Sequence, residues 1–126
     1  MTNDPGLIQA VEDCTFPAAD FHHREHVRLA WLYLRAGPYP QALERMIGSI
    51  RRFAAHVGAP DKFHYTMTEA WIRVVHAAIT QQPADTGFDA LLEANPHLLN
   101  VKILEEFYSA SLLNSPEAKA RMVEPD

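Results

Sequence analysis

The chain has 126 residues, which is the size of one domain and is enough for a hydrophobic core. Hydrophobic residues make up 48% of it, a fraction that excludes a disordered chain. No run of about 18 apolar residues is present and the N-terminus lacks the features of a signal peptide, so we expect a cytoplasmic protein without a membrane partner. The net charge of -5 argues against a nucleic-acid partner, because such binding depends on neutralising phosphates.

Three stretches in the first half of the chain have helical periodicity. A short helix is predicted over residues 5–13, and a second over residues 22–35 with Asp20 as its N-cap. The stretch 40–57 is the clearest amphipathic helix, because its apolar side chains recur at spacings of three and four residues. These apolar residues are Leu43, Met46, Ile47, Ile50, Phe53 and Val57.

Capping residues mark the helices predicted in the second half. Thr66 is the predicted N-cap of a fourth helix, with Glu69 on its outer face and reaching back in a capping box. A short helix is expected over residues 88–94, and a longer one over residues 98–113. A final short helix is expected over residues 115–122, which start with a serine cap. The longer helix is predicted to bury Val101, Leu104, Phe107, Tyr108 and Leu112.

The pattern of the chain favours helices throughout. No segment of four to eight residues alternates between apolar and polar side chains as a half-buried strand would. There is no internal repeat and no low-complexity stretch. The sequence therefore predicts an all-α fold, a single-domain bundle of five to seven helices that spans residues 1–126.

The most informative stretch for function runs from Asp20 to His26, since it holds three of the seven histidines. His22 and His26 are four residues apart on one predicted helix, a spacing that suits a single divalent metal ion such as zinc, iron, copper or nickel. His64 is the natural third ligand, because the positive end of the following helix disfavours a charged imidazole. One interpretation is therefore a divalent metal ion as cofactor, bound by His22, His26 and His64.

Two other interpretations of the histidines remain open. In the first, His26 and His64 line one cavity for an organic ligand, and aromatic side chains shape it. In the second, the histidines are structural and bind backbone carbonyls or water. Neither a His-Glu-x-x-His motif nor a Glu-x-x-His pair is present to favour the metal. The other residues of the predicted ligand pocket are Trp31, Tyr65, Trp71 and Tyr108.

The chain resembles a known group of sequences in two histidine motifs, residues 21–31 and residues 63–71. The resemblance also includes Tyr108-Ser109 and the C-terminal stretch from Ser115. The chain resembles an uncharacterised family of small bacterial all-helical proteins with a Phe-His-His-x-x-His motif and a second Phe/Tyr-His-x-Thr motif. The resemblance implies a bacterial, all-helical protein in which His26, His64 and Tyr108 are grouped. It implies no activity.

The pattern thus favours a small helical protein with a histidine-lined pocket that binds a metal ion or a small molecule. Whether the protein is an enzyme stays open at this point. The alternative function is a non-catalytic module for protein–protein interaction or dimerisation, with a second copy of the chain as partner. The two functions differ in their response to His64→Ala, which should remove ligand binding from a pocket protein and leave an interaction module unaffected.

Overall fold

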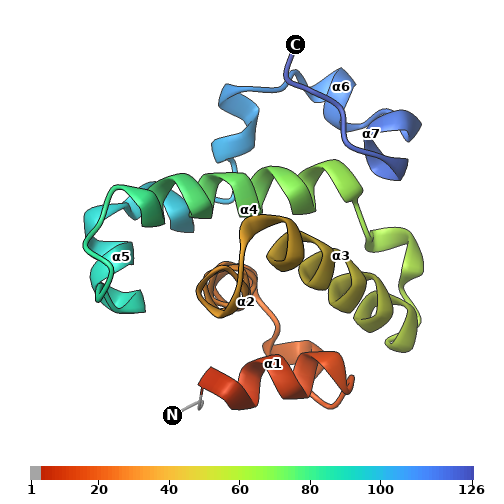
Figure 1. Ribbon diagram of the computed structural model, residues 1–126. Coiled ribbons are helices and arrows are strands. Elements are labelled where there is room, and N and C mark those ends of the chain that lie inside the picture. The colour runs from red at the N-terminus through yellow and green to blue at the C-terminus, as the bar shows by residue number, and fades with distance from the viewer. Residues whose placement is uncertain (1–3) are drawn as a thin grey trace. The chain divides into compact units, whose positions relative to one another are not determined.

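The computed structural model describes residues 4–126, apart from the side chains of Asp4 and Pro5. The fold is all-α, as predicted: residues 4–126 contain seven α-helices, four short 3-10 helices and no β-strand (Figure 1). Contacts along the chain group into two compact units, Met1–Phe63 and His64–Asp126. The prediction of a single domain stays a prediction. Within residues 4–126, no helix combines the length and the apolar character that crossing a membrane requires.

Three helices form the first unit, and each packs against the other two (Figure 1). They are α1 (Asp4–Glu12), α2 (His23–Ala36) and α3 (Tyr39–His56), close to the three predicted stretches. Two short 3-10 helices, η1 (Ala18–Asp20) and η2 (Pro60–Lys62), precede α2 and follow α3. The apolar stripe of α3 is buried as its periodicity predicts, apart from Leu43, which is half-buried, and Val57, which is exposed.

Glu12 joins the three helices of the first unit through its carboxylate. The Tyr33 hydroxyl, on α2, donates a hydrogen bond to Glu12 Oε2 at 2.7 Å. The Arg45 guanidinium, on α3, contacts the same oxygen at 2.9 Å. Tyr33 is buried, and this burial is the main cause that raises its pKa far above the usual value. The buried hydroxyl therefore stays protonated and can donate its hydrogen bond to Glu12.

The second unit is built on the long helix α4 (Tyr65–Thr80), against which the short helix α7 (Pro116–Ala120) packs (Figure 1). Between them lie α5 (Phe88–Ala94), η3 (Pro96–Leu99), η4 (Ile103–Glu106) and α6 (Ala110–Leu113). Ser115 caps α7 by accepting a hydrogen bond from the backbone N–H of Ala118, as the sequence predicts. The core of this unit includes Ala70, Ile103, Leu104, Tyr108 and Leu113.

The predicted helix over residues 98–113 is wrong, since this stretch forms η3, η4 and α6 instead of one continuous helix. The Asn100 side chain accepts a hydrogen bond from the backbone N–H of Lys102 at 3.0 Å, a local turn that competes with a helix. The chain thereby turns at this point, and Val101 and Phe107 are 62% and 53% exposed instead of buried. Leu104 and Tyr108 are buried as predicted, and Leu112 is half-buried.

The C-terminal residues are fastened to α4 by a buried hydroxyl. Thr66 Oγ1 donates to the backbone oxygen of Arg121 at 2.8 Å and accepts from the backbone N–H of Val123 at 3.2 Å. Tyr108 donates its hydroxyl hydrogen to the backbone oxygen of Val123 at 2.8 Å. Thr66 is completely buried, so water cannot replace its partners if the hydroxyl is removed.

We therefore expect Thr66→Val to lower the free energy of unfolding by about 1–2 kcal/mol, measured by urea denaturation. Valine keeps the shape of threonine, so the loss reports the two hydrogen bonds. Thr80→Val is the matched control, because Thr80 is exposed and its hydroxyl donates to the backbone oxygen of Ala77 within the same helix. The control should change stability by less than about 0.5 kcal/mol. Equal effects of the two changes would contradict a special role of Thr66.

Candidate functional site

The N-terminus of α2 decides where its three histidines point. His22, and not Asp20 as predicted, is the N-cap residue of α2, and its backbone N–H donates to Glu25 Oε1 at 3.0 Å. Asp20 closes the preceding turn, in which its own N–H donates to Pro17 O. The helix thus begins later than predicted. His22 is exposed, whereas His26 lies one turn further along and is partly buried.

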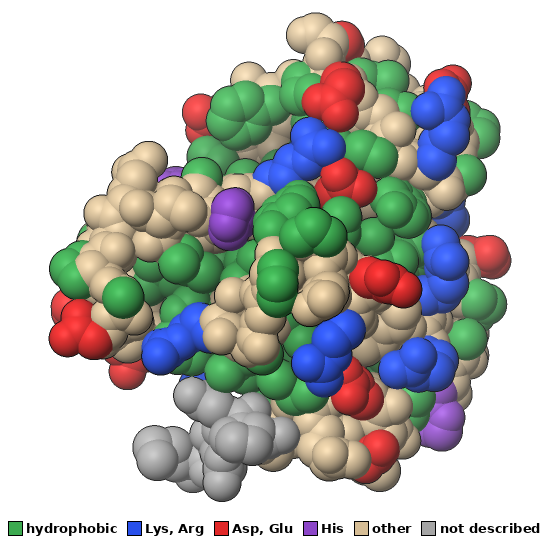
Figure 2. Space-filling view, viewed as in Figure 1, with side chains coloured by type: hydrophobic (Ala, Val, Ile, Leu, Met, Phe, Trp, Pro, Cys, Tyr) green, Lys and Arg blue, Asp and Glu red, His purple; other side chains and the backbone are tan. Residues whose placement is uncertain are grey.

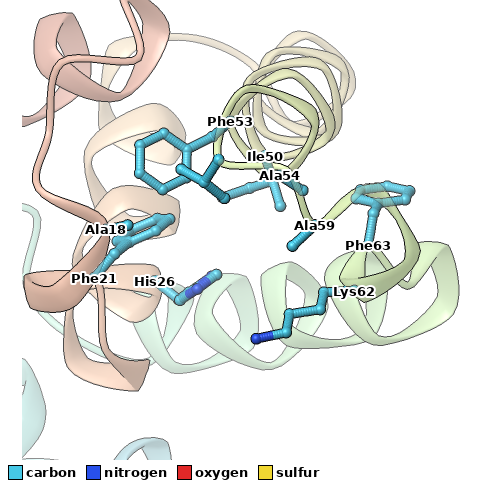
Figure 3. A pocket seen from close by; sticks show the side chains of 10 residues that line it. Ala18, Phe21, His26, Ile50, Phe53, Ala54, Ala59, Lys62 and Phe63 are labelled. Atoms are coloured by element: carbon cyan, nitrogen blue, oxygen red, sulfur yellow. The ribbon is translucent and has the colours of Figure 1, made fainter.

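His26 lines a cavity of about 280 Å³ in the first unit (Figure 3). The walls come from η1, the start of α2, the C-terminal part of α3, and η2 with the residue after it. Most of the lining is aliphatic or aromatic, and the polar groups are those of His26 and Lys62. The ten lining residues are Ala18, Phe21, His26, Ile50, Phe53, Ala54, Val57, Ala59, Lys62 and Phe63.

An aromatic cluster holds the His26 ring in place. Phe21 stacks on this ring with the two centroids 4.2 Å apart and the planes inclined by 14°. Phe21 also meets the rings of Phe16 and Phe53 edge-on, at 5.7 Å and 5.0 Å between centroids. The side chain of His26 points into the cavity from the wall that it shares with Phe21 (Figure 3). Phe16 and Phe53 thus hold Phe21 in place, and Phe21 in turn orients the imidazole of His26.

Burial keeps the imidazole of His26 uncharged. Desolvation is the main cause that lowers the pKa of His26 to about 4, and the nearby His23 acts in the same direction. Glu25 opposes them with a smaller effect. Among residues 4–126, no protein group is hydrogen-bonded to the ring nitrogens of His26. At neutral pH the ring of His26 therefore carries one N–H donor and one nitrogen acceptor.

Lys62 brings the one formal charge that lines the pocket at neutral pH. Its side chain extends from η2 toward the side of the cavity where His26 lies (Figure 3). No Asp or Glu is among the lining residues, and in the described part of the chain no carboxylate forms an ion pair with Lys62. The pocket therefore combines an apolar wall, a neutral imidazole and a positive ammonium group.

His64, the second predicted site histidine, has a different environment. It is the N-cap residue of α4, where the sequence predicts Thr66, and its Nδ1 accepts from the backbone N–H of Met67 at 3.1 Å. Its Nε2 lies 2.7 Å from the backbone oxygen of Leu113 and donates to it, since a carbonyl only accepts. Both ring nitrogens are thus bonded to backbone, which favours the structural interpretation of His64. Its predicted role as a ligand stays a prediction.

Glu69 does not close a capping box, because the cap of α4 lies at His64 and Glu69 contacts Arg73. Glu69 Oε2 lies 2.7 Å from the guanidinium of Arg73, one turn further along α4. Glu69 is buried, although the sequence predicts it on the outer face. Arg73 also approaches Glu124 in the C-terminal tail at 3.3 Å. These ion pairs help to hold the C-terminal residues against α4.

The remaining predicted site residues lie in two different units. Trp31 is buried in the first unit, with the Arg35 guanidinium 4.7 Å from its ring centroid, and it does not line the His26 pocket. In the second unit, Trp71 packs against the core cluster that contains Tyr108, and Tyr65 is half-buried on α4. A joint pocket of His26, His64 and these aromatic residues stays a prediction.

A metal centre bound by His22, His26 and His64 also stays a prediction. Within residues 4–126, no group of three or more His, Cys, Asp or Glu side chains has the arrangement that could hold a metal ion. In the first unit His22 is exposed to solvent, whereas His26 lines the mostly apolar cavity.

Sequence reasoning missed four residues that shape the pocket: Phe21, Phe53, Lys62 and Phe63. Phe21 and Phe63 each directly precede a histidine of the two motifs, and this position next to a candidate site residue is a signal in the sequence. Phe53 looks like an ordinary core residue of α3. Lys62 has no sequence signal, because a single lysine before a helix is most often a solvated surface residue.

A second, more polar hollow lies on the other side of α3. Its volume is about 640 Å³, and its lining includes both acidic and basic side chains, among them the pair formed by Arg45 and Glu12. Acidic and basic side chains are also mixed on the face drawn in Figure 2, where Lys and Arg are interspersed with Asp and Glu. Because Arg45 and Glu12 already neutralise each other, this hollow would attract a charged ligand less strongly than the pocket at His26.

Comparisons of the chain with protein-family models, with curated proteins and with solved structures gave no match.

Proposed function

We propose that this protein binds a small organic molecule in the His26 pocket. The observation that carries the proposal is a partly buried, uncharged imidazole that lines a mostly apolar cavity and has no hydrogen-bond partner among the described residues. Polar groups inside proteins are nearly always hydrogen-bonded, because leaving one without a partner costs free energy. A ligand that enters the cavity would satisfy the His26 ring and bury its own apolar surface against the phenylalanines.

The lining supports an organic ligand better than a metal ion. Small-molecule pockets are mostly apolar with a few polar groups, and about 300–1,000 Å³ in volume. A cavity of about 280 Å³ lies just below that range and suits a ligand smaller than a typical drug molecule. A metal ion needs several donor atoms, whereas His26 is the one imidazole of this lining and no carboxylate accompanies it. The ammonium group of Lys62 would also repel a cation at this place.

Filling the pocket tests the proposal. Phenylacetamide is a suitable neutral probe, since it joins one ring to one hydrogen-bonding group, and its binding can be followed by protein NMR. We expect a saturable shift of the backbone resonances of Phe21, His26 and Lys62. Ala54→Phe places a large side chain into the cavity and should weaken binding at least about tenfold, because ring and probe would occupy the same space.

Ala55→Phe is the matched control, because Ala55 follows on the same helix but is exposed and does not line the cavity. It should bind phenylacetamide as the unchanged protein does. Ala54→Leu provides a smaller insertion if the phenylalanine variant does not fold. Absence of binding to the unchanged protein, or equal binding by the Ala54 and Ala55 variants, would refute the proposal.

The alternative function, interaction or dimerisation, depends on the surface of the molecule and stays a prediction. The exposed side chains of Val101 and Phe107 in the second unit, with Leu99 nearby in sequence, are the apolar surface that such a function would use. A molecular mass that rises with protein concentration would favour this alternative.

A further inference from the structure

We infer that the ligand of the His26 pocket is a small organic anion, a monocarboxylate whose apolar body holds a single planar ring. This inference rests on the proposed function, because it names the chemical class of the ligand that the cavity takes. Its basis is the joint placement of Lys62, His26 and three phenylalanine rings around one cavity.

The charge of the lining is the first argument. Lys62 is positive, and none of the other nine lining residues is an acid that would neutralise it. The Arg51 guanidinium lies 4.7 Å from the ring centroid of Phe63, which is another lining residue, so a second positive group stands behind this wall. Asp61 neighbours Lys62 in the chain but is not among the lining residues. An anion in the cavity would therefore be attracted from this side.

The hydrogen-bonding groups are the second argument. A carboxylate has two oxygens that accept, and it forms its strongest hydrogen bonds with charged donors such as a lysine ammonium group. The side chain of Lys62 extends toward the side on which His26 points into the cavity (Figure 3). One carboxylate oxygen would thus receive a hydrogen from Lys62 and the other from the ring N–H of His26. A neutral imidazole retains this donor, so no protonation is required beforehand.

The shape of the remaining wall is the third argument. Phe21, Phe53 and Phe63 contribute aromatic surface, and Ile50 with the alanines contributes aliphatic surface. Planar rings pack well against such side chains, in stacked or edge-on geometry. Inorganic phosphate would bring charge but no apolar surface, and would leave this wall in contact with water. The apolar lining therefore selects an organic anion over an inorganic one.

Phenylacetate and phenylacetamide form a matched pair for the test, because they share ring and size and differ in charge. We expect the unchanged protein at pH 7 to bind phenylacetate about tenfold more tightly than phenylacetamide, measured by NMR titration at fixed ionic strength. Lys62→Gln should reduce this preference to about twofold or less, because glutamine keeps a hydrogen-bond donor but removes the positive charge. Lys102→Gln, which alters an exposed lysine of the second unit, should keep the preference. Inorganic phosphate should not displace phenylacetate.

A second readout follows the imidazole itself. A bound carboxylate stabilises the charged form of a neighbouring histidine, so phenylacetate should raise the pKa of His26 and phenylacetamide should not. The titratable groups that act on the pKa of His26 are His23 and Glu25 of α2. Lys62 of η2 lines the same cavity, while the lining residues of η1 and α3 carry no charge. Equal binding of the two probes, or a preference unchanged in Lys62→Gln, would overturn the anion inference. The proposed function would survive that result if Ala54→Phe still abolished binding. Failure of both probes to bind would overturn both.

Discussion

Lowering the pH from 7 to 4 is expected to destabilise the unchanged protein by about 3 kcal/mol more than the His26→Gln variant. The pKa of His26 is about 4 in the folded protein, against 6.5 for the ordinary side chain. Between these values the unfolded chain binds a proton that the folded chain does not, so the free energy of unfolding falls as the pH falls. Each pKa unit corresponds to about 1.4 kcal/mol, which gives the expected difference.

The sign and the range of this effect are both specific. The stabilisation by a neutral His26 is complete above about pH 6.5 and is lost as the pH falls toward about 4. Below pH 4 both forms of the chain are protonated and the effect stops growing. The measurement is urea denaturation at a series of pH values. The contribution of His26 is the difference between the wild-type protein and the variant in how the free energy of unfolding changes with pH. The carboxylates contribute equally to both proteins, so their effect cancels in this difference.

His56→Gln is the matched control for this measurement. It removes an exposed histidine at the end of α3 and leaves the His26 pocket intact, so its pH dependence should follow that of the unchanged protein. The same pH dependence in His26→Gln and in the unchanged protein would show that His26 titrates alike in the folded and unfolded chain. That outcome would remove the observation on which the proposed function depends.

His64→Ala is expected to lower the free energy of unfolding by about 2–3 kcal/mol and to leave phenylacetamide binding unchanged. The substitution removes the N-cap of α4, which is worth about 1 kcal/mol, and leaves the carbonyl of buried Leu113 without its donor. This result would differ from the one expected if His64 bound a ligand, in which binding is lost and the fold remains. Denaturation and an NMR titration with phenylacetamide measure the two quantities separately.

Two further variants of the second unit complete the experiment. His64→Asn should recover about 1 kcal/mol relative to alanine, because asparagine is a good N-cap but its amide is too short to replace both bonds of the imidazole. His97→Ala alters an exposed histidine and should change stability by less than about 0.5 kcal/mol. Unchanged stability in His64→Ala together with lost binding would refute the structural role and favour the predicted one.

The helices were largely predictable because their signals are local. The amphipathic stretch 40–57 matches α3, and residues 88–94 match α5, since apolar periodicity and a stop at Asn95-Pro96 lie within the segments themselves. The stretch 98–113 was not predictable in this way. Its apolar residues resemble a helix in sequence, but the turn at Asn100 divides it and exposes Val101 and Phe107.

The candidate site was predictable only as far as the choice of His26. The spacing of the histidines drew attention to the start of α2, and the structure places His26 in a pocket there. The partners of His26 in that pocket, Phe53 and Lys62, come from segments far along the chain and have no shared motif. For His64, nothing in the sequence indicates its bond to the backbone oxygen of Leu113, 49 residues away, and its predicted role as a ligand stays a prediction.

The sequence by itself determined the all-α class and the approximate positions of α2 and α3, because periodicity, caps and spacing act between near neighbours. It also singled out His26 as a candidate site residue. Only the tertiary structure decided that His26 is partly buried and uncharged, that Lys62 lines the same pocket, and that the ring of His64 is hydrogen-bonded to the backbone oxygen of Leu113. The physical reason is that burial, charge and hydrogen-bond satisfaction depend on neighbours in space, and folding brings these together from segments that are distant in the chain.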